Sequence, residues 1–244
     1  MSFKKTLSRI SVSEQVIDSI IDSISNGYYK AGDRLVNERE MAESFGISRV
    51  PLREAVRALN VLGVLESRQG DGTFISAYNP DILGKTIYIQ SILTDTSKDE
   101  IFETRGIMES EAARLAAKNA TPEDLDEIEK AMLKREESMT GLAGKSINKE
   151  IAFQTDQSFH RSIAKAAHNS YFLLYMDALF YSVKEQQLVA LEDPESFKRA
   201  SEYHRMVFNA IKNKNQELAY EFMKSHIEAV CESYKKVDKL KEVK

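Results

Sequence analysis

The chain has 244 residues, of which 42% are hydrophobic and 30% are charged, a composition typical of a soluble globular protein with room for two domains. Its formal net charge of −4 excludes a general attraction to nucleic acid, so any DNA contact must come from a local basic patch. Its single cysteine excludes an intrachain disulfide, and since it has neither a signal-like start nor an apolar run long enough to span a bilayer, we expect a cytoplasmic protein.

The first predicted elements are helices. Apolar side chains recur at helical spacing over residues 12–25, and residues 38–59 then read as a short helix, a turn at Gly46 and a second helix with Ser48 as its cap. Three arginines recur every fourth residue on the second helix: Arg49, Arg53 and Arg57. A tight helix pair with an arginine stripe on its second helix predicts a helix-turn-helix. The stripe is suited to DNA because guanidinium groups match guanine edges and phosphate oxygens. The alternative is a solvated basic face on an ordinary helix.

Residues 65–76 follow with two short strand-like runs around a Gly-rich tip, which is the pattern of a β-hairpin. A hairpin directly after a helix-turn-helix makes the winged version of that motif, with Arg68 and Gln69 near the wing tip. An ordinary surface turn is the alternative. We predict a winged helix-turn-helix domain over residues 1–77, a linker at 78–81, and a second domain over 82–244.

The second domain shows helical patterns and no strand alternation. Its predicted helices span residues 81–94, 98–118, 122–138, 147–167, 171–189, 195–212 and 216–238. Gly141 and Gly144 mark a loop between the third and the fourth of these helices. Seven helices with short connections predict an all-α antiparallel bundle, so the fold class of the whole chain is mainly α.

Three histidines are predicted to lie at matching heights in this bundle. His204 and His226 lie eleven residues before and eleven residues after a turn centred near Asn215, so they face each other across an antiparallel hairpin. Counted from the turn near Asn169, His160 lies within about one helical turn of His204, at ~1.5 Å per residue. All three rings are therefore expected in one layer of the bundle.

A carboxylate completes this group, because Asp156 lies four residues before His160 on the same helix and faces the same way. Three imidazoles and one carboxylate suit a divalent ion, with Zn²⁺ preferred and Ni²⁺ or Mn²⁺ as alternatives. The opposing interpretation is a set of scattered core or surface histidines. The fourth histidine, His168, is interpreted as a capping or surface residue beside Asn169.

Arg105 and Glu109 are also four residues apart, on the predicted helix 98–118. In one interpretation they form a surface ion pair, which is worth less than ~1 kcal/mol. In the other, Arg105 points into the bundle and binds the carboxylate of an anionic effector bidentately. Spacing alone leaves both interpretations open.

The N-terminal part resembles the GntR family of bacterial transcription regulators. The resemblance is carried by Ala31-Gly32-Asp33-Arg34-Leu35, Glu38-Arg39-Glu40-Met41-Ala42, the run from Phe45 to Ala55, and a wing-like Gly70-x-Gly72-Thr73-Phe74-Ile75. The C-terminal part resembles the FCD ligand-binding domain of the FadR subfamily. That resemblance is carried by Arg105-Gly-Ile-Met-Glu109, Asp156-Gln-Ser-Phe-His160, His204 and Met223-Lys-Ser-His226. One departure is His168, which stands where a glycine is common.

The resemblance implies a homodimer that binds a palindromic operator, and a metal ion at the floor of a cavity for a small organic acid, with Arg105 as an effector-binding residue. The residues expected to contact DNA are Arg39, Ser48, Arg49, Arg53, Arg57, Arg68, Gln69 and Gly70. We therefore predict a transcription regulator that acts as a repressor and is not an enzyme. A metal-dependent hydrolase and a metal-free helical interaction protein are the alternatives; four protein ligands without a separate general base argue against the hydrolase.

Overall fold

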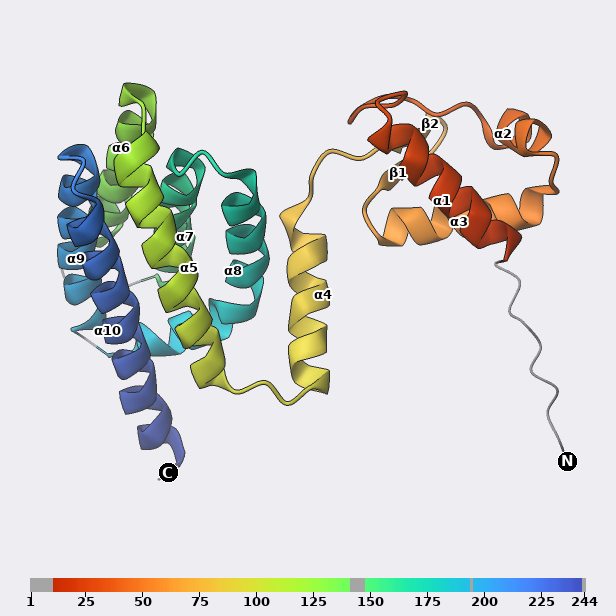
Figure 1. The fold of residues 1–244 in the computed structure, drawn as a ribbon. Coiled ribbons are helices and arrows are strands. Elements are labelled where there is room, and N and C mark those ends of the chain that lie inside the picture. Colours follow the sequence, from red (N-terminus) through yellow and green to blue (C-terminus); the bar gives the residue numbers. More distant parts are fainter. Residues whose placement is uncertain (1–10, 141–147, 194, 243–244) are drawn as a thin grey trace, which may run out of the picture. The chain divides into compact units, whose positions relative to one another are not determined.

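The structure is a computed structural model that describes residues 11–140, 148–193 and 195–242. Helices dominate these residues, and the strands described among them form one two-stranded sheet (Figure 1). The chain divides into two compact units, of which the first ends at Ile82 and the second begins at Leu83. The architecture confirms the predicted fold class, a winged helix-turn-helix followed by an all-α bundle.

The first unit has the element order of a winged helix-turn-helix. Its elements are α1 (Val12–Ser25), α2 (Glu38–Phe45), α3 (Arg49–Val61), β1 (Leu65–Arg68) and β2 (Gly72–Ile75). The side chain of Asn37 caps the start of α2, and Gly46 ends α2 with a left-handed φ of 65°, which glycine adopts without steric cost. Ser48 occupies the N-cap position of α3 but, contrary to expectation, its side chain makes no capping hydrogen bond.

A small apolar core orients the elements of this unit. Leu52 and Leu59 of α3 are fully buried in it and pack with side chains from α1, α2 and both strands. The antiparallel strands pair Leu65 with Ile75 at the buried end and Arg68 with Gly72 at the exposed end. Because the apolar stripe of α3 is buried, its arginine stripe faces solvent, and the wing tip projects away from the core.

The second unit is a helical bundle. Its helices are α4 (Pro80–Leu93, which begins at the end of the first unit), α5 (Lys98–Asn119), α6 (Pro122–Thr140), α7 (Lys149–Ala166), α8 (Ser170–Ala190), α9 (Ser196–Lys212) and α10 (Gln216–Glu242). These bounds agree with the predicted helices to within a few residues. The predicted loop at Gly141 and Gly144, and the predicted helix start at residue 147, lie outside the described residues.

Helices α5 to α10 pack against one another in the bundle. Helix α10 packs along α5 and α9, and α7 packs against α5, α6 and α8 (Figure 1). Helix α4 approaches α8 closely because residue 84 is a glycine; a Cβ atom there would lie 2.6 Å from that of Tyr181. Among the described residues, no helix is both long and apolar enough to cross a membrane.

Candidate functional site

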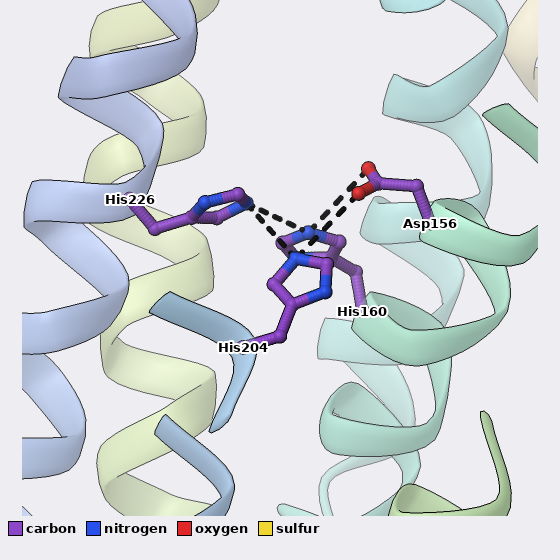
Figure 2. A group of neighbouring side chains, drawn as sticks. All are labelled: Asp156, His160, His204 and His226. Atoms are coloured by element: carbon purple, nitrogen blue, oxygen red, sulfur yellow. Dashed lines mark hydrogen bonds and ion pairs between the residues drawn. The ribbon is translucent and has the colours of Figure 1, made fainter. Parts of the chain in front are cut away.

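Four side chains from three helices converge in the interior of the bundle (Figure 2). Helix α7 carries Asp156 and His160 one turn apart, α9 carries His204, and α10 carries His226. Nε2 of His226 lies 3.2 Å from Nε2 of both other histidines, and the Asp156 carboxylate lies 3.6 Å from His160 and 3.5 Å from His204. The four residues that the sequence placed at one level of the bundle are therefore close together in the structure.

These separations fit a single divalent ion. Two imidazole nitrogens that are each about 2.1 Å from one ion lie roughly 3.0 Å apart at a right angle and roughly 3.4 Å apart at the tetrahedral angle. The 3.2 Å between the Nε2 atoms falls between these two values. All four side chains are buried, which shields the group from bulk water. An Asp/His₃ set of this kind could hold Zn²⁺ or a similar metal ion.

Burial also keeps two of these imidazoles in the form that binds metals. It lowers the pKa of His226 to about 3, and the neighbouring His160 adds to this effect. Burial, reinforced by the positive charge of Arg135, lowers the pKa of His204 well below its ordinary value. Because metal ions bind neutral imidazole, these rings present their lone pairs at neutral pH without first losing a proton.

Helix α5 supplies a second layer of contacts behind His160. Oε2 of Glu109 lies 2.5 Å from Nδ1 of His160, and Oε1 of Glu109 accepts a hydrogen bond of 2.6 Å from Nε of Arg105. Burial raises the pKa of Glu109, but Arg105 and His160 outweigh it and bring the value down to about 2. The carboxylate is therefore ionised and lies against Nδ1 of His160, and its charge favours a proton on that nitrogen, which leaves Nε2 to face the cluster.

Arg105 itself points into the bundle. Its side chain is 0% exposed, so its ion pair with Glu109 is buried rather than at the surface. Only its Nε atom is used by that pair; within the described part of the chain, Nη1 and Nη2 have no hydrogen-bond partner. A buried guanidinium edge with free donors is the arrangement that binds a carboxylate through two parallel hydrogen bonds.

A second buried arginine borders the cluster and was not predicted. Nε of Arg135, on α6, donates to Oδ1 of Asp156 at 3.0 Å, and its Nη1 donates to Ser201 at 2.8 Å. The Arg135 side chain is 2% exposed. Its position in the sequence held a signal, because it continues the buried face of α6 that also contains Ile128 and Met132 at helical spacing.

The other carboxylate oxygen of Asp156 is also engaged. Oδ2 accepts a hydrogen bond of 3.1 Å from Nε2 of Gln187 on α8. Burial raises the pKa of Asp156, but the charges of Arg135 and His160 lower it by more, so the pKa of Asp156 lies below its ordinary value. Beside this carboxylate lies a cavity of about 20 Å³ that Arg135, Gln187 and apolar side chains such as Phe153 line. This volume accommodates one water molecule.

The predicted DNA-binding residues lie in the first unit, and all eight are exposed. Arg49, Arg53 and Arg57 occupy the solvent face of α3, and Arg68 and Gly70 lie at the wing tip. An open groove of about 590 Å³ runs between α2 and the wing, with Glu38 and Arg68 among its lining residues. Helix α3 and the tip of the β1–β2 hairpin therefore both expose arginine side chains on this small domain, as a winged helix-turn-helix requires for DNA binding.

Two of these arginines already have partners. Nε of Arg53 donates to Glu38 of α2 at 2.8 Å. Arg68 makes two hydrogen bonds of 3.1 Å to Glu66, and its guanidinium carbon lies 4.3 Å from the ring centroid of Phe74. These contacts restrict two long side chains that would otherwise be free to rotate. Neither Glu38 nor Glu66 was predicted from the sequence to be a functional residue.

Both units match known families. The model of bacterial regulatory proteins of the gntR family matches residues 12–75, and the model of the FCD domain matches residues 100–229. An Escherichia coli (strain K12) protein, provisionally named the L-lactate dehydrogenase operon regulatory protein, is 33% identical over 236 residues, which cover 93% of this chain and 88% of that protein. The HTH-type transcriptional regulator LutR of Bacillus subtilis (strain 168) is 27% identical over 209 residues, covering 84% of this chain and 92% of LutR.

A solved structure extends the similarity to three dimensions. The GntR protein of Streptococcus agalactiae superimposes with a TM-score of 0.71 at 29% sequence identity. The match covers 91% of this chain and 100% of that one, so it includes both the winged unit and the helical bundle.

Proposed function

The chain belongs to the gntR family of bacterial regulatory proteins and carries an FCD domain, and from this we propose that it is a repressor whose operator binding responds to a small carboxylic acid. The acid binds in the helical bundle, beside a divalent metal ion held by the Asp/His₃ cluster. The general role, transcription regulation, is shared with its relatives. We also assign the chain to the FadR subfamily and its site of action to the cytoplasm.

The observation that carries this proposal is the free edge of Arg105. Its two Nη atoms are buried, point to no partner in the described chain, and belong to the same buried charge network as the metal cluster. Leaving such donors unpaired costs about 1–3 kcal/mol or more, so a ligand that supplies acceptors gains that free energy on binding. A carboxylate matches the guanidinium edge in charge and geometry.

The cluster residues would hold the ion as follows. His160, His204 and His226 would bind it through Nε2, and Asp156 through a carboxylate oxygen. When bound, a divalent ion supplies a positive centre with open positions for an oxygen of the acid. Zinc is the first candidate because three imidazoles and one carboxylate match its ligand preference, and nickel or manganese are alternatives.

At the DNA, we assign base contacts to Arg49 and Arg53 and phosphate contacts to Arg39, with support from Arg57 and the wing tip. A single module of this size binds weakly, so we propose a homodimer whose two-fold axis matches that of a palindromic operator. The acid acts by binding the two conformations of the dimer with different affinity, since a ligand shifts an equilibrium only by that difference.

The decisive experiment measures operator affinity of the metal-loaded chain with and without acid, and it begins with L-lactate because a relative is named for an L-lactate dehydrogenase operon. We expect L-lactate or a related small acid to weaken operator binding, and the variant Arg105→Gln to bind operator normally but lose the response. Operator binding that no small carboxylate changes would refute the sensor. A metal content indistinguishable from background in carefully purified protein, with a full response to acid, would refute the metal site.

A further inference from the structure

Arg135 poses a charge problem that the proposed function does not resolve. The buried site contains two guanidinium groups, those of Arg105 and Arg135, and two carboxylates, those of Glu109 and Asp156. Each carboxylate pairs with one guanidinium, at 2.6 Å and 3.0 Å. When the imidazoles are counted in the neutral form that binds a metal ion, the charges of the protein groups in the site cancel.

A divalent ion would leave this site with an excess of two positive charges. The remaining buried carboxylates of the described bundle are engaged elsewhere: Asp177 with Arg161, Asp193 with Lys236, and Asp124 with His168. An uncompensated buried charge is strongly unfavourable. A bound monocarboxylate compensates one of the two charges, and a dicarboxylate compensates both.

The geometry indicates which guanidinium would lose its carboxylate partner when a metal ion binds. Asp156 belongs both to the metal cluster and to the ion pair with Arg135, so an ion that takes its carboxylate weakens that pair. Arg135 also forms a wall of the 20 Å³ cavity, whose volume has room for one water molecule but not for an organic acid. Movement of its guanidinium away from Asp156 would enlarge this cavity and leave the guanidinium free to bind another carboxylate.

We propose that Arg135 is a second effector-binding residue, which binds a second carboxylate of the ligand once a metal ion engages Asp156. The site therefore selects short dicarboxylic acids over monocarboxylic acids. This inference rests on the proposed function of the metal cluster, and it adds the charge class of the effector. Ser201, which already accepts a hydrogen bond from Nη1, holds the guanidinium at the cavity wall.

L-Malate and L-lactate test the proposal directly, because both are 2-hydroxy acids and L-malate carries one additional carboxylate. Isothermal titration of the full, zinc-loaded chain should show at least about tenfold tighter binding of L-malate. The variant Arg135→Met should abolish this preference while it retains L-lactate binding, and Arg135→Lys, which retains the charge, should keep part of it. The matched control is Arg205→Met, since Arg205 pairs with Glu136 at the exposed surface and its loss should leave the ratio unchanged.

A second measurement, made without any acid, separates a ligand-binding role from a purely structural one. Arg135→Met removes the cation that competes for Asp156, so zinc affinity should rise, and a fall would overturn the proposed competition. Equal or tighter binding of L-lactate by the wild type overturns the proposal whether or not a variant folds, as does an unchanged ratio in Arg135→Met. If neither acid binds or alters operator affinity, the proposed function fails as well, whereas a response to L-lactate without the predicted ratio refutes only the role of Arg135.

Discussion

Oε2 of Glu109 lies 2.5 Å from Nδ1 of His160, and this contact joins α5 to the metal cluster on α7. Because the carboxylate is ionised, its charge beside Nδ1 favours the tautomer that carries the proton on that nitrogen and keeps the Nε2 lone pair toward the other histidines. The same carboxylate accepts from Arg105, so one residue positions both a metal ligand and the proposed anchor for the acid.

Replacement of Glu109 by Gln should therefore weaken metal binding. We expect a loss of about 10–100-fold in zinc affinity, since outer partners of metal-bound histidines contribute by that amount. Competition with a chromophoric chelator measures the affinity. The control is Glu111→Gln, because Glu111 pairs with Arg114 at the surface of the same helix. Equal losses in both variants would contradict the specific role of Glu109.

The histidines provide an internal control for metal content. His204→Ala removes one of four converging ligands and should reduce bound metal, measured by elemental analysis, to well below one ion per chain. His168→Ala should leave the metal content unchanged, because its Nε2 lies 2.7 Å from Asp124, outside the cluster. A similar metal content in His204→Ala and the wild type would exclude the proposed ligand set.

Arg53 should contribute strongly to operator recognition. We expect Arg53→Ala to weaken specific binding by about 1–3 kcal/mol, the range for an arginine that contacts a base edge. Fluorescence anisotropy with an operator duplex and a scrambled duplex separates specific from general binding. Arg114→Ala, a change in the helical bundle, is the control. Wild-type affinity of Arg53→Ala for its operator would end this assignment.

Glu38 should affect specificity rather than affinity alone. It holds Nε of Arg53 at 2.8 Å, so it restricts the guanidinium before DNA binds, but its charge also repels phosphates. Glu38→Gln should therefore bind scrambled DNA more tightly and show a smaller ratio of specific to non-specific affinity. The control is Glu54→Gln, which removes the same charge from α3, where Glu54 accepts a hydrogen bond from Ser13 rather than from Arg53; its specificity ratio should stay at the wild-type value.

Asp193 should make stability depend on pH. The hydrogen bond from Lys236, at 2.8 Å, is the main reason why the pKa of Asp193 lies below its ordinary value, and Ser233 donates a second bond of 3.0 Å. A depressed pKa stabilises the fold above the unfolded-state value of 3.8 and ceases to do so as the pH falls through the folded-state value. Asp193→Asn should lower the free energy of unfolding by about 1–3 kcal/mol at pH 7.

Urea unfolding at several pH values measures this effect. The difference between wild type and Asp193→Asn should be constant from neutral pH down to mild acid and should shrink only below the ordinary pKa of aspartate, 3.8. A difference that already disappears near neutral pH would point to another titrating group. In the background of Lys236→Met the same substitution should cost less, because the two side chains act as a pair.

Two features of this protein follow from the sequence alone, because they depend on local and regular geometry. Helical periodicity located the helices of both units, and the constant rise of a helix together with short turns placed His160, His204 and His226 at one height. Nε2 of His226 lies 3.2 Å from Nε2 of His160 and from Nε2 of His204, in agreement with that counting. The arginine stripe of α3 was equally visible, since residues four apart share a helix face.

The surroundings of the cluster depended on the tertiary structure. Spacing left Arg105 either at the surface or inside, and the packing of other bundle helices against α5 places it in the interior. Arg135 meets Asp156 across 21 residues of chain, from a helix whose rotation about its axis is set by Ile128 and Met132 in the core. Periodicity shows which residues share a face, but the partner of that face is decided by long-range packing between helices, and the charge balance of the site follows from that packing.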